Sequence, residues 1–135
     1  MRNNIIINLS DPGSTSGVTT AYRRSTTSLA NFSALSDKNN FYAGTPSANR
    51  LIFFDGSNSD QMLSDYQTRV SPRESNSRSV TVDFVNAAAG DLHLSGASVG
   101  DINLVAFPNP ELPKTLTVIS EMRISLIKER TSQHQ

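Results

Sequence analysis

The chain has 135 residues, twelve basic and twelve acidic side chains, no Cys and a hydrophobic fraction of 36%. This length suits one domain with a hydrophobic core. The balanced and scattered charge predicts no nucleic-acid partner, and the absence of Cys excludes disulfides and thiolate metal sites. No apolar run approaches the roughly 18 residues of a membrane span, so none is expected.

Six short strands and one short helix are expected, because runs of β-branched and aromatic residues alternate with turn-forming residues. The helix is expected at Gln61–Gln67, where Met62 and Tyr66 fall at helical spacing, and Asp60 is expected to cap it. The expected strands are, in chain order, Asn4–Leu9, Val18–Arg23, Asn40–Ala43, Arg50–Phe54, Ser79–Phe84 and Asp91–Leu94.

Two pairs of asparagines stand directly before apolar runs, Asn3-Asn4 before "III" and Asn39-Asn40 before "FYA". In a parallel solenoid, Asn side chains at equivalent corners of successive coils bond to one another and to the turning backbone. An unpaired buried amide would cost about 1–3 kcal/mol, so the pairs are interpreted as a structural Asn ladder. The alternative to a ladder is that the two pairs arise by chance in a chain with twelve Asn residues. Side-chain alternation directs either Ile6 alone or both of its neighbours to the interior.

The order of motifs from Asp60 to Asp101 resembles the C-terminal end of secreted bacterial right-handed parallel β-helix proteins of the pectate-lyase-like superfamily. The resemblance covers roughly residues 3–103. The motifs that carry it are a helical piece ending at Tyr66-Gln67, Asn76-Ser77, Phe84-Val85-Asn86, the "GDLHL" strand at Gly90–Leu94 and the "SGASVG" turn at Ser95–Gly100.

The resemblance implies an all-β fold, a few coils of right-handed parallel β-helix from the C-terminal end of a solenoid. Residues 1–103 would form the coils and residues 104–135 a tail. The long run of preceding coils is missing, and no signal peptide precedes Asn3. The chain is therefore expected to be a C-terminal piece of an extracellular or cell-surface protein whose upstream coils are its partner. Its first strand would be an uncovered edge, which favours self-association.

The tail departs from the resemblance. Family members typically end in a segment of the form "DFDGDxRN…PDxGADE". Codons can be chosen for Lys114–Ser132 so that reading from the third base of each codon spells "DFDGDIRNADFPDKGADE". The hypothesis is that the reading frame slips between about Asn103 and Lys114. The residues after the slip are expected to pack poorly and to contain no site.

No catalytic residue is expected in this chain. His93 alternates with two Leu residues in "DLHL", so it is expected to face solvent on a strand. There is no Gly-x-Ser-x-Gly elbow and no recognisable Ser-His-Asp set.

A calcium loop is the alternative to the expectation of no cofactor and no metal. Asp55, Ser57 and Ser59 place oxygen atoms at alternate positions before Asp60. The Glu expected at the twelfth position of such a loop is replaced by Tyr66. Turn chemistry explains "DGSNSD" without a metal.

Glycan contact is a candidate role for Tyr22, Arg23 and Arg24, where an aromatic ring and two cations could meet a sugar and an acidic group; a solvated strand face is the alternative. The resemblance implies carboxylates and basic residues as catalytic groups in central coils, and C-terminal coils lie past them. Possible counterparts in this chain, none of them expected to be catalytic, are Arg23, Arg24, Asp37, Asp55 and Asp60.

The expected function is that of a non-catalytic C-terminal portion with a structural or glycan-binding role. One alternative is the terminal part of a polysaccharide lyase or glycoside hydrolase with its catalytic coils upstream. The other is a small independent β-sandwich that binds a partner.

Overall fold

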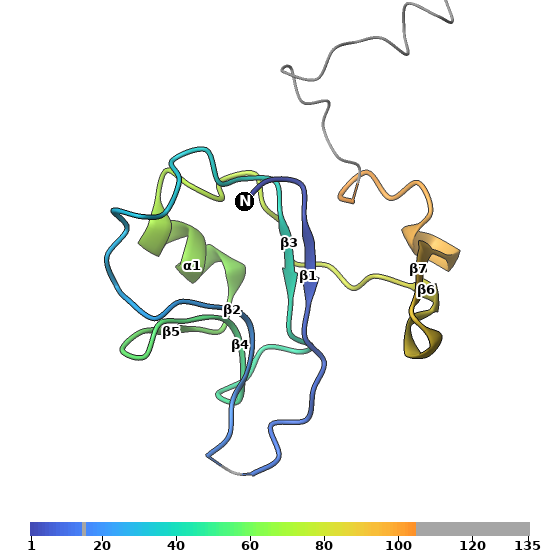
Figure 1. The fold of residues 1–135 in the computed structure, drawn as a ribbon, viewed down its shortest axis with the longest axis horizontal. Coiled ribbons are helices and arrows are strands. Elements are labelled where there is room, and N and C mark those ends of the chain that lie inside the picture. The colour runs from blue at the N-terminus through green and yellow to red at the C-terminus, as the bar shows by residue number, and fades with distance from the viewer. Residues whose placement is uncertain (15, 105–135) are drawn as a thin grey trace, which may run out of the picture.

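The computed structural model describes residues 1–14 and 16–104. It contains seven short strands, one α-helix and two 3₁₀ turns among these residues (Figure 1). The strands are β1 (Ile5–Ile7), β2 (Thr19–Arg23), β3 (Asn40–Tyr42), β4 (Arg50–Phe54), β5 (Ser59–Asp60), β6 (Phe84–Asn86) and β7 (Asp91–Leu94). The helices are α1 (Leu63–Val70) and the 3₁₀ turns Ala87–Ala89 and Gly96–Ser98.

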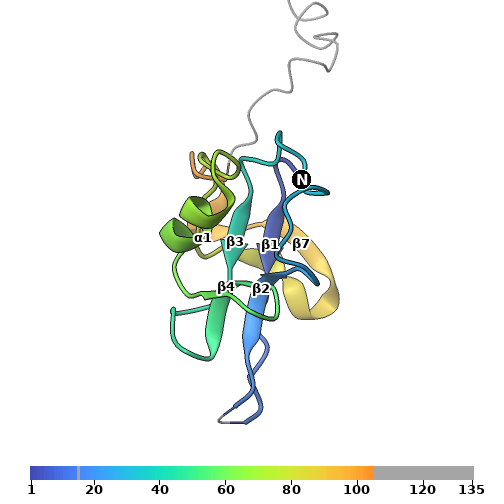
Figure 2. The same ribbon diagram turned by 90° about the vertical axis from the view of Figure 1, so that its left-hand side faces the viewer.

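The described strands form three small sheets. β1 pairs with β3 in parallel, with Ile6 opposite Phe41. β2 pairs with β4 in parallel, and β5 adds to the other side of β4 in the antiparallel direction. β6 and β7 form an antiparallel hairpin. Figure 2 shows β1 above β2 and β3 above β4, so the sheet of β1 and β3 lies above the sheet that contains β2 and β4.

The expected fold class, an all-β right-handed parallel β-helix, is wrong. The described strands lie in three separate sheets of mixed direction, none of them closed or solenoidal, and α1 contributes to the core, so this part of the chain is a small α/β domain. The turn after β4 is one physical reason. The Asp55 carboxylate accepts hydrogen bonds from the backbone N–H groups of Ser57 and Asn58, and Gly56 adopts a φ of 94°. This tight turn sends the chain back along β4.

The core lies between α1 and the strands β3 and β4. The side chains of Tyr66 and Val70 occupy one face of α1, as their i, i+4 spacing requires. The Tyr66 ring stacks on Phe53 of β4 with ring centroids 4.8 Å apart, and it meets Phe41 of β3 edge-on at 5.5 Å. The buried members of this cluster are Phe32, Phe41, Ile52, Phe53, Tyr66 and Val70.

Several local expectations need correction. The expected helix start is wrong, since α1 begins at Leu63 after the N-cap residue Met62, and no side chain caps it. Asp60 instead lies buried in β5 and pairs with Arg69. The expected strand at Ser79–Phe84 is wrong except at its last residue, where β6 begins. None of the described helices is long and apolar enough to span a membrane.

Candidate functional site

The asparagine pairs lie where three segments of the chain stack at one corner of the domain. The Asn4 side-chain amide donates to Asn39 Oδ1 at 2.8 Å, and the Asn4 backbone N–H donates to the same oxygen at 3.1 Å. Asn39 in turn donates through Nδ2 to Glu74 Oε2 at 2.9 Å. These hydrogen bonds join residues that are far apart in the sequence, so they fix the three segments to one another.

Glu74, which sequence reasoning missed, is the centre of this network. Its side chain is fully buried, with 0% exposed, and its carboxylate accepts hydrogen bonds from Ser36 Oγ at 2.6 Å, Ser77 Oγ at 2.5 Å and Asn39. Three donors satisfy much of the acceptor capacity of an ionised carboxylate. No local signal marks a Glu in "PRESNS" as buried, because two of its three donors, Ser36 and Asn39, come from a distant segment.

Asn40 fixes the chain on the other side of β3. Its Oδ1 accepts from the Val80 N–H at 2.9 Å, and its Nδ2 donates to the Val80 carbonyl at 3.0 Å. The side chain thus pairs with residue 80 as a neighbouring strand would. Asn3 is exposed and has a φ of 55°. The predicted ladder residues are therefore brought together at one corner, with the direct amide contact between Asn4 and Asn39.

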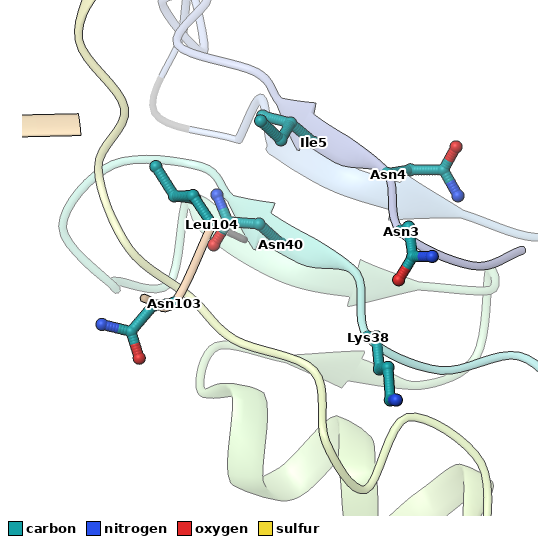
Figure 3. Close-up of a pocket in the computed structure, with 7 residues that line it drawn as sticks. All are labelled: Asn3, Asn4, Ile5, Lys38, Asn40, Asn103 and Leu104. Atoms are coloured by element: carbon teal, nitrogen blue, oxygen red, sulfur yellow. The ribbon is translucent and has the colours of Figure 1, made fainter. Parts of the chain in front are cut away.

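A pocket of about 240 Å³ opens beside these asparagines. Figure 3 shows the Asn4 and Asn103 side chains pointing away from one another at its two ends. The amides of Asn4 and Asn40 are already hydrogen-bonded, and that of Asn103 donates to Asp101. The pocket is thus largely a by-product of the stacked segments. Its lining residues are Asn3, Asn4, Ile5, Lys38, Asn40, Asn103 and Leu104.

The three candidate glycan residues do not form one platform. The Tyr22 ring is half-buried and lies about 6 Å from the rings of Phe41 and Phe53 in the core. The Arg24 guanidinium donates to the Ser28 carbonyl and to Asn31 Oδ1, both at 2.7 Å.

Arg23 lies apart from these contacts. It is the exposed residue of the three, and its guanidinium carbon lies 5.3 Å from the centre of the Phe54 ring. A sugar would therefore meet Arg23 without the Tyr22 ring beside it.

The two carboxylates of the candidate calcium loop, Asp55 and Asp60, are engaged by protein groups. Desolvation works to raise the pKa of Asp55, but hydrogen bonds from Asn58 and Ser57 outweigh it and hold the pKa below its usual value. The Asp60 carboxylate accepts two hydrogen bonds from Arg69, at 2.6 and 2.7 Å, and this bonding raises the pKa of the guanidinium. Among the described residues, no group of three or more His, Asp and Glu side chains is placed to hold a metal ion.

His93 and Asp91 form an exposed pair on β7. His93 Nδ1 lies 2.6 Å from Asp91 Oδ1, and the His93 side chain is 88% exposed. Hydrogen bonding from His93 lowers the pKa of Asp91. Both groups face water, so nothing strengthens their interaction as burial would.

The outer side of β1 has backbone groups that the described fold does not use. Asn40 N–H donates to the Asn4 carbonyl at 2.8 Å, and Asn8 N–H donates to the Tyr42 carbonyl at 2.9 Å. Backbone groups of alternate residues point to opposite sides of a strand. Those of Ile5 and Ile7 therefore point away from β3, where no described strand pairs with β1. This side of β1 is called the open edge below.

Apolar side chains accompany the open edge. Ile5 is 41% exposed, and Leu9, which follows β1, is 60% exposed. Ile6 points the other way and packs against the aromatic core. The sequence predicted an uncovered edge here, and the described residues leave it so.

Comparison of the chain with protein-family models, with curated proteins and with solved structures found no match in any of the three. The resemblance to pectate-lyase-like proteins stays a prediction.

Proposed function

We propose that this domain is a non-catalytic structural and binding module that docks a β-strand of a partner along the open edge of β1. The single observation that carries the proposal is the unused pair of backbone groups at each of Ile5 and Ile7. An extended segment laid along such an edge gains main-chain hydrogen bonds and places alternate side chains against the edge residues.

Hydrogen bonds and apolar contact would both stabilise a strand docked at the open edge. Each backbone hydrogen bond contributes about 0.5–1.5 kcal/mol net. Covering apolar surface adds about 25 cal/mol per Å² removed from water, and Ile5 and Leu9 expose such surface in β1 and directly after it. Part of this gain offsets the loss of freedom of the docked strand.

The hydrogen-bond partners of the buried carboxylates support a structural role. Glu74 holds together Ser36, Asn39 and Ser77, and Asp60 holds Arg69. A carboxylate serving as a general acid or base needs access to substrate. The contacts of these carboxylates are instead internal.

The placement of the domain within a parent protein follows from the resemblance. An extracellular or cell-surface protein could supply strands from its own upstream segment to the open edge. If that parent degrades polysaccharide, the catalytic groups would belong to the upstream segment. The sequence encoded before codon 1 and a cleavage assay on acidic polysaccharide test this alternative.

Amide hydrogen exchange on the full chain tests the proposal. The probe is a synthetic strand peptide of alternating Thr and Val residues, flanked by Lys for solubility. We expect the amides of Ile5 and Ile7 to exchange quickly in the free protein, at concentrations low enough to keep it monomeric, and to slow when the peptide is added. The Asn8 amide, which is bonded to β3, should be slow throughout.

A peptide with Pro at alternate positions is the matched control, because it lacks the N–H donors that a strand needs. Unchanged exchange at Ile5 and Ile7 with the Thr-Val peptide in excess contradicts the proposal. Equal slowing by the Pro peptide also contradicts it.

A further inference from the structure

We infer that the open edge of β1 accepts β1 of a second copy of this chain, paired in the antiparallel direction around a two-fold axis at Ile6. The inference rests on the proposed function in one respect, namely that the open edge is a binding surface. It adds the identity of the partner, the direction of pairing and the register.

The sequence of β1 and its flanks is self-complementary. Asn4-Ile5-Ile6-Ile7-Asn8 reads the same in both directions. A two-fold interface brings the same patch of both subunits together. If residue i of one copy contacts residue j of the other, then residue j of the first copy also contacts residue i of the second. In antiparallel pairing centred on Ile6, Ile5 lies opposite Ile7 of the second copy, and Asn4 lies opposite Asn8.

The backbone groups of β1 point in the directions that this register requires. The backbone N–H and C=O groups that point away from β3 belong to Ile5 and Ile7. In an antiparallel pair, two residues directly opposite one another exchange two hydrogen bonds when the backbone groups of both residues point toward the partner strand. Ile5 of each copy therefore pairs with Ile7 of the other copy. This pairing uses the N–H and C=O groups of both residues in both strands. A shift by one residue would set outward groups opposite groups already bonded to β3.

Charge does not oppose this register. Arg2 is the only charged residue from Arg2 to Ser10, and it falls opposite Ser10 of the second copy. Like charges opposite one another would destabilise a strand pair, and none arise here.

The apolar surface beside the edge also fits a second copy. Ile7 and Leu9 line a hollow of about 670 Å³ that is completed by side chains from residues 82–96. In the inferred pairing, Ile5 of the second copy stands beside Ile7 on the same face. It would therefore lie at the mouth of this hollow, where Ile5, now 41% exposed, would be covered.

Sedimentation velocity of the full chain over a range of concentrations tests the association. We expect a monomer that converts to a dimer as the concentration rises. Ile5→Lys should weaken the dimer about tenfold or more, because it places a charge against apolar surface. Leu35→Lys is the matched control, since Leu35 is 68% exposed in the segment between β2 and β3. It should leave the association unchanged.

Cysteine cross-linking tests the register, and the chain has no Cys of its own. Ile5→Cys protein is mixed in equal amounts with Ile7→Cys protein and oxidised. The inferred register puts Cα atoms 5 and 7 about 5.5 Å apart, within disulfide reach, and leaves the like positions on a longer diagonal. We expect the mixed disulfide in clear excess over its statistical half share. Thermal unfolding of each variant, matching that of the unchanged chain, shows that folding is retained.

A chain that stays monomeric at all concentrations overturns the inference, as does a dimer that Ile5→Lys and Leu35→Lys weaken equally. Mixed and like disulfides in statistical proportion also overturn it. A monomeric chain whose Ile5 and Ile7 amides are still protected by the Thr-Val peptide overturns the inference and leaves the proposed function standing. Failure of both the second copy and the peptide overturns both.

Discussion

The side-chain amide of Asn39 and the carboxylate of Glu74 lie 2.9 Å apart, and both residues are buried. The side-chain oxygen of Asn39 also accepts a hydrogen bond from the side-chain amide of Asn4. The Asn39 side chain thus joins the residue that precedes β1, the segment that leads into β3 and the segment that follows α1. The corner that carries the open edge is held in place by this bridge.

Asn39→Ala should lower the free energy of unfolding by about 2–3 kcal/mol, because it removes a donor from the buried Glu74 carboxylate and an acceptor from Asn4. Chemical denaturation measures the change. Asn103→Ala is the control, because Asn103 is exposed and its amide bonds to Asp101 in its own turn. It should change the value by less than about 0.5 kcal/mol. Equal losses in the two variants would contradict the structural role of Asn39.

Tyr66→Phe should keep the free energy of unfolding or raise it by up to about 1 kcal/mol. The Tyr66 hydroxyl is buried and has no hydrogen-bond partner among the described residues, so its removal relieves a desolvation cost. Burial, together with the nearby Glu74, raises the pKa of this hydroxyl. Tyr66→Ala should cost about 3–5 kcal/mol through the cavity it leaves. A loss above about 1 kcal/mol in the Phe variant would show that the hydroxyl has a bonded partner.

The stability of the domain should fall in acid partly through Asp37. Desolvation works to raise the pKa of Asp37, but hydrogen bonds from the Asn76 side chain and backbone, both at 2.8 Å, outweigh it and hold the pKa below 3.8. A carboxylate with a lowered pKa in the folded state contributes stability above its unfolded pKa of about 3.9. That contribution is lost as the pH falls through the folded-state pKa.

Asp37→Asn should therefore lower stability at neutral pH and flatten the acid limb of the curve of unfolding free energy against pH. Asp65→Asn, on the exposed side of α1, is the control and should leave the acid limb steeper than Asp37→Asn does. An unchanged acid limb in Asp37→Asn would rule out the linkage.

The frame-slip hypothesis for the tail concerns residues outside those that the structure describes, and the nucleotide sequence tests it. The codons for residues 115–131 should spell the family's terminal segment when read from the third base. The hypothesis fails if the shifted frame yields an unrelated peptide or a stop codon.

Local patterns in the sequence predicted much of the secondary structure. The expected strands Arg50–Phe54 and Asp91–Leu94 are confirmed with their bounds, because each is a run of strand-forming residues bounded by clear turn signals. The alternation of side chains in β1 was predicted as two options, and Ile6 is the residue that faces the core.

The fold class and the centre of the network could not be predicted in this way. The reversal of the chain after β4 depends on how the Asp55 side chain bonds the turn, and turn residues alone do not fix the direction of the next strand. Asp60 was expected at a helix cap, but its partner Arg69 lies on α1 itself. The burial of Glu74 depends largely on Ser36 and Asn39, which are donors from a distant segment.

N-methylation of single backbone amides in β1, introduced by semisynthesis, tests the central claim most directly. A methyl group on the Ile7 amide blocks a donor of the open edge, and one on the Asn8 amide breaks its 2.9 Å hydrogen bond to the Tyr42 carbonyl. We predict that methylation at Ile7 abolishes binding of the Thr-Val strand peptide and changes the free energy of unfolding by less than about 0.5 kcal/mol. Methylation at Asn8 should lower that free energy by at least about 1 kcal/mol. Undiminished peptide binding after methylation at Ile7 would contradict the claim that the open edge of β1 is the binding surface.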